Sequence, residues 1–415
     1  MTRLSAPGFP EAAVRDRARR GTACAFPDTD DYGRTVHGQR TETDPDALDA
    51  CRLVPPVFMP HRLEKLIDLG REPLYSDVDL RTEIGGFTAP FPLTLSAFGS
   101  TRIASTDLGQ AASAQAGRLG IPMVIGENIV PVNGYGRLGT GTESSLLARI
   151  RAYANAVPDG LGGIVVQQST EDADAEVWNL VYSDPSAQAM LVSGRLGFEL
   201  KAGQGAKPGL GGMTVLRGEK AAELADQFAL DRVFDDAGDT VLRNASPGTL
   251  TEEILRQQIR LMRNNFPRAR VWVKLHPARD VREAAMTAWE AGADAVTVDG
   301  AEGGTGWAPR AFLDHVGLPL AECLRRIGAH PNCLLAGGRL WEGARVAKCL
   351  ALGARAGALG RAALLAVDED PEAGLIRLVE CLALELRMLI SALGKYVPGD
   401  LSPEDLWSPA PAATD

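Results

Sequence analysis

The sequence predicts an α/β fold, a (β/α)8 TIM barrel with an N-terminal extension and a long insertion after the fourth strand. From about residue 92 onward, eight short β-rich runs alternate with amphipathic helical stretches, the pattern of a parallel sheet wrapped by helices. A length of 415 residues suits one such barrel with insertions. A glycine-rich turn follows the sixth run, whereas an open doubly wound sheet carries its glycine fingerprint near the start. A closed barrel is therefore favoured.

The elements of this barrel can be placed along the chain. Each strand is expected where an apolar, β-branched run ends in glycine or a polar residue: residues 92–97, 121–126, 163–168, 198–203, 271–276, 293–299, 333–338 and 354–360. Helices are expected over residues 106–119, 142–156, 249–265, 281–291, 341–352 and 371–393. Gly394 then supplies a C-cap for the last helix.

Three segments lie outside the repeating pattern. Residues 1–85 lack periodicity and are interpreted as an extension packed on the barrel of residues 86–400, and residues 401–415 as a tail. About 45 residues separate the fourth strand from the next helix, far more than the ~2–6 of an ordinary βα loop. Residues 217–233 of this insertion are expected to be helical. Because βα loops form the catalytic face of a barrel, the insertion is a candidate lid.

Composition limits the classes of function. A hydrophobic fraction of 45% and a charged fraction of 23% are those of a globular protein with a large core. A net charge of −10 without a basic run argues against nucleic acid, so small molecules are the expected partners. No segment has the ~20 apolar residues of a membrane span, and a cytoplasmic location is expected. The six cysteines lack C-x-x-C spacing and are interpreted as free, mostly buried thiols.

The segment of residues 299–306, with the sequence DGAEGGTG, is the first candidate for a binding site. It joins the β-branched run of residues 295–298 to a helix-forming stretch, so it is a glycine loop at the end of a strand. Glycines leave backbone N–H groups uncovered, and the main chain can then approach an anion or a flat ring closely. A plain flexible turn is the alternative interpretation.

Functional groups of a barrel collect at the carboxyl ends of its strands. In chain order these positions are Ser96, Phe98, Glu127, Gln167, Gln168, Lys201, Gln204, Lys274, His276, Asp299, Gly337, Gly338, Arg339, Gly360 and Arg361. The loops after strands seven and eight are the usual phosphate grip of this architecture. Both carry glycine followed by arginine, Arg339 and Arg361, which predicts a phosphate clamp. Capping glycines with solvated arginines remain the alternative.

Lys274 is a charged residue inside the apolar run VWVKL. A buried ammonium must find a partner, and a fixed cation at a barrel mouth suits an anionic ring such as the reduced flavin of barrel flavoenzymes. A salt bridge to Glu199 or Asp299 is the alternative. His276, two residues further on, is either a site residue or part of the barrel wall.

Residues 198–212, FELKAGQGAKPGLGG, resemble the "EIK-AQGAKPGEGG" signature of the FMN-binding synthase domain of glutamate synthase. The loop of residues 299–306 resembles that family's "SGHDGGTG". The dipeptide at 126–127 resembles the start of its "GEGG", and residues 95–100 resemble its "GAMSYGS". The resemblance covers about residues 67–393, including the closing helix.

The resemblance implies FMN as cofactor and a reaction in which an imine takes up a hydride over the flavin. Gln204 and Lys207 would lie by the substrate carboxylates, and Glu127 near the ammonia or imine. These three are the predicted catalytic residues. With the strand-end positions, the candidate cofactor-binding residues are Ser96, Ala97, Phe98, Gln168, Lys274, Asp299, Gly303, Gly304, Thr305, Gly306, Gly337, Gly338, Arg339, Gly360 and Arg361.

Three departures from the family pattern bear on function. The cysteine triplet for an iron–sulfur cluster is absent from residues 362–378, so no metal ligand is expected. Met1 is followed by Thr2, not by the cysteine nucleophile of the family's glutaminase domain. Leu210 and Met213 stand where glutamate and glutamine are expected, so specificity for 2-oxoglutarate is not implied.

The function predicted is an FMN-dependent oxidoreductase that transfers hydride between flavin and the C–N centre of a small amino or imino acid. The alternatives are a flavin-barrel hydroxy-acid oxidase, a redox-neutral flavoenzyme and a non-catalytic FMN-binding partner subunit. An electron-donating or electron-accepting partner and a homo-oligomer are both compatible with the sequence.

Overall fold

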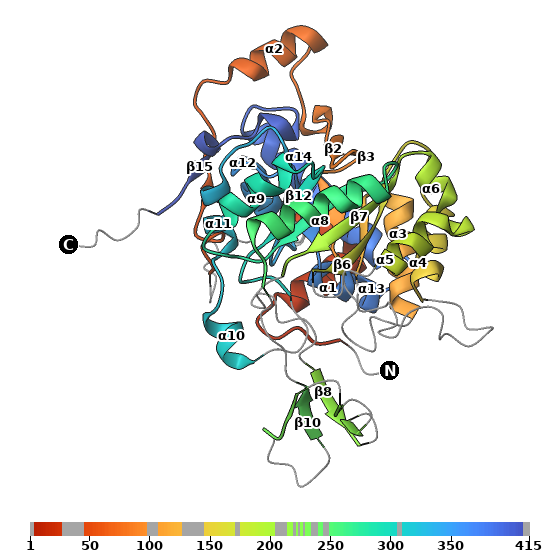
Figure 1. Ribbon diagram of the computed structural model, residues 1–415. Coiled ribbons are helices and arrows are strands. Elements are labelled where there is room, and N and C mark those ends of the chain that lie inside the picture. The colour runs from red at the N-terminus through yellow and green to blue at the C-terminus, as the bar shows by residue number, and fades with distance from the viewer. Residues whose placement is uncertain are drawn as a thin grey trace.

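The centre of the molecule is a closed barrel of eight parallel strands (Figure 1). The computed structural model describes residues 4–26, 45–97, 107–126, 145–170, 175–203, 214–218, 221–222, 225–226, 229–233, 240–243, 249–304 and 309–409. In sequence order the barrel strands are β4 (Leu93–Leu95), β5 (Met123–Ile125), β6 (Ile164–Ser169), β7 (Leu196–Lys201), β11 (Arg270–Leu275), β12 (Ala295–Asp299), β13 (Cys333–Gly337) and β14 (Ala356–Leu359). The predicted fold class is confirmed, and each strand overlaps its predicted position.

Helices surround the barrel and bury the outer faces of its strands. They are α3 (Asp107–Leu119), α4 (Ser145–Ala154), α5 (Ala175–Ser183), α6 (Gln188–Val192), α8 (Glu252–Asn265), α9 (Val281–Glu290), α10 (Arg310–His315), α11 (Leu320–Ile327), α12 (Gly343–Ala351), α13 (Arg361–Glu369) and α14 (Gly374–Ala392). The six predicted helices are present. Thr251 caps α8, because its Oγ1 accepts a hydrogen bond from the Ile254 N–H at 3.2 Å. Gly394 follows α14 with φ +72°, as a C-terminal glycine should.

A short hairpin closes the amino end of the barrel. It consists of β2 (Thr82–Ile84) and β3 (Phe87–Ala89), and it packs with Val124, Val165, Trp272 and Leu335 in one apolar cluster inside the barrel. The Trp272 indole N–H donates to the Gly85 carbonyl at 3.0 Å. Since this end is plugged, a ligand would enter from the carboxyl ends of the strands.

The first 85 residues contain helices that the sequence analysis did not predict. Helix α1 (Glu11–Arg20) packs on α13 and α14, and Arg15 forms ion pairs with Asp368 at 2.9 Å and Glu369 at 3.1 Å. Strand β1 (Arg52–Leu53) pairs with β15 (Leu406–Trp407), and helix α2 (Pro60–Leu69) stands away from the barrel (Figure 1). Short 3-10 turns cover Gly21–Ala25, Tyr75–Asp77, Pro185–Ala187, Pro398–Asp400 and Pro403–Asp405.

The insertion after β7 contains a small antiparallel sheet in strand order β8 (Thr214–Arg217), β10 (Thr240–Arg243), β9 (Leu230–Asp231). The prediction of a helix over residues 217–233 is wrong at both ends, since Arg217 and Leu230 lie in strands. Pairing with residues 240–243, more distant in sequence, supplies backbone hydrogen bonds that local helix propensity does not reveal.

Candidate active site

A layer of polar side chains lies inside the barrel, above the apolar cluster at its amino end. Successive strand residues point to opposite faces, so Trp272, Lys274 and His276 of β11 and its following loop face the same way. The same alternation places Gln167, Glu199 and Thr297 next to Lys274, and Asp299 one step closer to the open end. All of these except His276 are at least 95% buried.

Lys274 supplies a positive charge to this polar layer. Its Nζ lies 3.1 Å from Oδ2 of Asp299, and both side chains are almost fully buried. The salt bridge to Asp299, the alternative raised by the sequence, is therefore present. It also fixes the ammonium at the open end of β11.

Glu199 of β7 lies beside Lys274. Its carboxylate accepts a short hydrogen bond from the Gln167 amide and one from the Thr297 hydroxyl at 3.3 Å. Burial raises the pKa of Glu199, and the positive charge of Lys274 opposes that rise. Lys274 thus interacts with two carboxyl groups, Asp299 and Glu199. The net charge that this group of residues presents to the open end of the barrel therefore depends on whether Glu199 is ionised.

A cavity of about 10 Å³ separates this layer from the plug, the space of about one water molecule. Its lining includes Thr94, Ser96, Glu199, Lys274 and Thr297. A flavin ring cannot enter it. Any ring bound here would lie above the strand ends, against the outer side of the polar layer.

The loops after β13 and β14 carry glycines, and β14 lies beside β4. Gly360 stands at the N-terminus of the nine-residue α13, and no described side chain caps that end. A Cβ at Gly360 would meet only Ser96 among the described residues, at 3.9 Å, so its backbone faces open space. Gly338 has φ +137° and lies against the Gly300 backbone, with 3.2 Å between its Cβ position and the Gly300 nitrogen. The N-terminus of a helix with free N–H groups is a suitable cradle for a phosphate.

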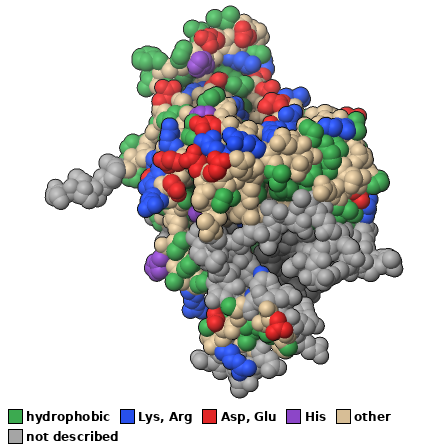
Figure 2. All heavy atoms as spheres, in the orientation of Figure 1, with side chains coloured by type: hydrophobic (Ala, Val, Ile, Leu, Met, Phe, Trp, Pro, Cys, Tyr) green, Lys and Arg blue, Asp and Glu red, His purple; other side chains and the backbone are tan. Residues whose placement is uncertain are grey.

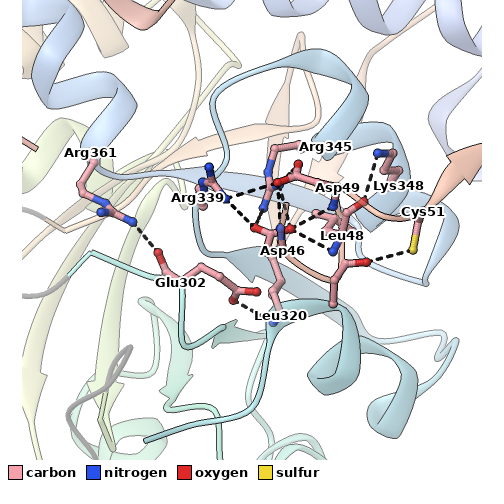
Figure 3. A network of polar contacts seen from close by, with 11 residues as sticks. Asp46, Leu48, Asp49, Cys51, Glu302, Leu320, Arg339, Arg345, Lys348 and Arg361 are labelled. Carbon is pink, nitrogen blue, oxygen red and sulfur yellow. Dashed lines mark hydrogen bonds and ion pairs between the residues drawn. The ribbon is translucent and has the colours of Figure 1, made fainter. Parts of the chain in front are cut away.

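The two arginines of the predicted clamp make contacts within the protein (Figure 3). Arg339, at φ +50°, lies 3.5 Å from Asp46 and 3.3 Å from Asp49 of the N-terminal extension. The same aspartates bind Arg345 of α12, which is fully buried, and Arg345 reaches Asp46 at 2.6 Å. Although burial opposes it, Arg345 holds the pKa of Asp46 below its usual range. The N-terminal extension therefore completes the loop after β13.

Arg361, at the start of α13, joins the two glycine loops. Its guanidinium donates a hydrogen bond to the Glu302 carbonyl and stacks on the Phe9 ring, 4.6 Å from the ring centre. The Glu302 carboxylate accepts the Leu320 N–H at 2.9 Å. Burial, and then the nearby Arg339, lower the pKa of Arg361. Both arginines are half-buried and contact other protein groups, unlike the solvated arginines of the alternative interpretation, and the phosphate clamp stays a prediction.

The remaining predicted residues differ in where they lie. Ser96 and Ala97 line the interior cavity, and Gly303 and Gly304 form the turn beside Arg361. Gln168 is not brought into the interior: it alternates with Gln167 and bonds to that residue's own carbonyl at 3.0 Å. His276 Nδ1 lies 3.2 Å from the Ala202 carbonyl, and burial lowers the pKa of this imidazole. Phe98, Glu127, Gln204, Lys207, Thr305 and Gly306 lie outside the described residues.

The sequence analysis missed two parts of this site. Glu199, named only as an alternative partner of Lys274, shows the same signal as that lysine, a lone charge within an apolar strand. Asp46 and Asp49 belong to the aperiodic extension. Nothing local indicates that they contact residues almost 300 positions later.

Comparison with known proteins identifies the family. The model of the conserved region in glutamate synthase matches residues 132–369, more than half of the chain. The chain belongs to this family. A glutamate synthase large subunit-like protein of Rhizobium meliloti is 37% identical over 42% of this chain and 40% of its own. An archaeal-type glutamate synthase [NADPH] of Thermotoga neapolitana is 28% identical over 71% of this chain and 57% of its own.

Solved structures support the fold. An (S)-mandelate dehydrogenase superposes with a TM-score of 0.56 at 17% identity, over 97% of this chain and all of the other. A mandelate oxidase mutant solved with a monooxide FMN adduct gives 0.53 at 18% identity, over 88% and 89%. The predictions of family and fold class are confirmed.

Two further properties of this glutamate synthase family member concern its helices and its cysteines. None of its described helices combines the length and the apolar character needed to cross a membrane. The six cysteines are free thiols, of which Cys24 and Cys333 are half-buried and the others buried. The chain spans about half the length of the glutamate synthase relatives that it matches.

Proposed function

We propose that this glutamate synthase family member is an FMN-dependent oxidoreductase that transfers hydride between flavin and the C–N centre of a small amino or imino acid. The observation that carries the proposal is that the uncapped N-terminus of α13 at Gly360, the glycine turn at Gly338 and the buried Lys274 all lie at the same open end of the barrel. When bound, FMN would supply the hydride acceptor or donor.

The residues fit the phosphate end of FMN. The α13 N-terminus offers backbone N–H groups beside Gly360, and the nearest described atom to the position that a Cβ at Gly360 would take is the Ser96 Cβ, 3.9 Å away. Because Asp46 and Asp49 hold Arg339, and Glu302 and Phe9 hold Arg361, backbone amides would supply the direct contacts. The arginines would hold the loops in place and add positive charge at short range.

The residues also fit the polar end of the flavin ring. Lys274 would place an ammonium under the pyrimidine side, where negative charge accumulates on reduction. Asp299 and Glu199 limit that charge, since two carboxyl groups face one ammonium. These described residues would bind and orient the flavin ring and set the charge beneath it, and the polar layer would exclude bulk water from beneath the ring.

The substrate side of the proposal rests on the resemblance of residues 198–212. In sequence, Gln204 follows Lys201, the last residue of β7, by three residues, and Glu127 follows Gly126, which comes directly after β5. In the proposal Gln204 and Lys207 bind the substrate carboxylate and Glu127 lies by the nitrogen.

The test begins with the visible spectrum of the purified protein and the identity of the flavin released on denaturation. We expect a yellow protein that releases FMN and is bleached under anaerobic conditions by one or more amino acids. A colourless protein that takes up no added FMN would contradict the cofactor. Bleaching by 2-hydroxy acids alone would favour the hydroxy-acid oxidase.

Lys207→Ala tests the substrate side separately. It should retain FMN but lose about 2–4 kcal/mol of transition-state binding for a carboxylate substrate. Single-turnover reduction measures this loss. An unchanged rate constant and substrate affinity would remove the basis for the carry-over from glutamate synthase.

A further inference from the structure

Apolar side chains are exposed along one short segment of the N-terminal extension. Between residues 54 and 75, eight large hydrophobic side chains are exposed, including Val57 at 90%, Phe58 at 86% and Ile67 at 69%. The others are Val54, Leu63, Leu69, Leu74 and Tyr75. Figure 2 shows hydrophobic side chains over α2 at the top of the view. We name residues 54–69 of this segment the arm.

Helix α2, the main part of the arm, has no buried residue. Pro60 starts it, and Gly70 ends it with φ +65°. A helix of ten residues is marginal in water without tertiary packing. Its described links to the body run through Arg62, whose guanidinium lies 3.1 Å from the Tyr396 hydroxyl, and Lys65, which lies over the same ring. Leu63 and Ile67, one turn apart, share an uncovered face.

A mostly apolar groove lies at the base of the arm. It has a volume of about 540 Å³ and is lined by Met59, Pro73, Leu74, Tyr75, Met388 and Ala392, among others. Met388 and Ala392 belong to the end of α14, so one wall is a helix of the barrel shell. The groove therefore has a rigid wall from the barrel and an open side from the extension.

We propose that the arm of a second copy of this chain occupies this groove, so that two copies form a dimer with two-fold symmetry. The arm and the groove lie side by side on one chain, and a reciprocal exchange buries both in each copy with a closed interface. The exposed apolar side chains of residues 54–75 together present on the order of 800 Å², the area that each partner buries in a standard stable interface.

Charge on the arm favours a second copy over a strongly charged partner. Arg62 and Lys65 are balanced by Glu64 and Asp68 along α2, so the arm carries no net charge and suits a mostly apolar groove. The arm lies beyond the end closed by β2 and β3, and the insertion that follows β7 lies at the other end (Figure 1). A dimer formed there leaves the mouth of the barrel open, and the proposal does not depend on FMN.

The test is the molar mass of the full chain in solution by sedimentation velocity and light scattering. Wild type should have twice the chain mass of 44.0 kDa. Leu63→Glu/Ile67→Glu on the arm and Ala392→Arg in the groove should each give a monomer with unchanged circular dichroism. The control Leu261→Glu replaces an equally exposed leucine (55%) on α8 and should remain a dimer.

Three results would overturn the proposal. A wild-type monomer at tens of micromolar would leave the arm without a second copy. A dimer that survives the arm variant would place the interface elsewhere. A dimer that is lost in the arm variant but kept in Ala392→Arg would show that the arm contacts something other than the groove.

Discussion

Replacing Lys274 by methionine should destabilise the barrel far more than a typical surface substitution does. Methionine keeps the length of the side chain but removes the charge. Asp299 then loses the ammonium that lies 3.1 Å away, and Glu199 loses the positive charge that opposes the rise in its pKa. At 3.1 Å and an effective dielectric constant of about 20, the attraction between Lys274 and Asp299 is about 5 kcal/mol. Loss of one partner of a buried pair usually costs about 3–5 kcal/mol, and we expect a loss in that range.

The assay is urea unfolding of four proteins: wild type, Lys274→Met, Asp299→Asn and the double variant. Asparagine removes the unpaired charge, so the double variant should be more stable than Lys274→Met alone, with a coupling energy of about 2–3 kcal/mol. A loss below about 1 kcal/mol for Lys274→Met, or strict additivity in the cycle, would refute the assignment of a buried charge pair.

A second buried pair provides the matched control. Lys395 lies 2.6 Å from Asp405, and both side chains are as buried as the interior pair. Lys395→Met should lose comparable stability but leave FMN affinity unchanged, because it lies in the segment after α14. Lys274→Met should weaken FMN binding or lower the reduction potential of the bound flavin. Equal flavin properties in both variants would show that Lys274 does not face the ring.

Three further predictions follow from the structure. Gly360→Val should abolish FMN binding but keep the fold, because the Cβ position of Gly360 is open, whereas Gly399→Ala, also in open space, should change neither FMN binding nor the fold. The FMN content of each variant after reconstitution is the measurement, and a Gly360→Val protein that retains FMN would place the phosphate elsewhere. Burial and the neighbouring Glu385 raise the pKa of Glu342 to about 7 from its ordinary 4.5, so the folded state keeps a proton that the unfolded state releases, and the stability of the wild type falls between about pH 4.5 and pH 7. Glu342→Gln should flatten this fall and gain at most about 3 kcal/mol at pH 8, as measured by unfolding across that pH range. Parallel stability profiles of wild type and variant would contradict the raised pKa. Arg345→Met should leave Asp46 and Asp49 with Arg339 as their described partner, and it should cost about 3–5 kcal/mol of stability. Limited proteolysis within residues 45–53 should become faster, whereas an unchanged cleavage pattern would show that the ion pairs of Arg345 with Asp46 and Asp49 do not hold the extension.

The barrel could be predicted because its strands carry a strong local signal. A parallel strand buried on both faces is a continuous apolar, β-branched run, as in residues 295–298, and glycine or a polar residue ends it. β7 was placed two residues late because its first residues, Leu196 and Gly197, carry no β-branched side chain. The prediction of a helix in the insertion is wrong for a different reason. β8 is defined by its pairing with β10, and no local property of residues 214–217 specifies that partner.

The glycines of the candidate site can be located from the sequence more easily than the partners of its side chains. Gly338 and Gly360 directly follow β13 and β14, as predicted, because a glycine at a strand end has local meaning, and their binding of a phosphate stays a prediction. The role of an arginine depends on what it meets. Arg339 meets two aspartates from a segment without periodicity, and Arg361 meets a carbonyl and an aromatic ring. Residue type gave their chemistry, but only the three-dimensional fold gives their partners.

These contacts change how a phosphate would be held. Arg339 is already paired with two carboxylates, so it offers a phosphate a weaker net positive charge than a free guanidinium would. Backbone N–H groups at the start of α13 are not neutralised in this way, and no described side chain caps them. Asp46 and Asp49 also hold Arg345 of α12, so the loop that carries Gly338 is fixed from both sides. Cofactor retention should therefore depend on the docking of the N-terminal extension as well as on the glycines.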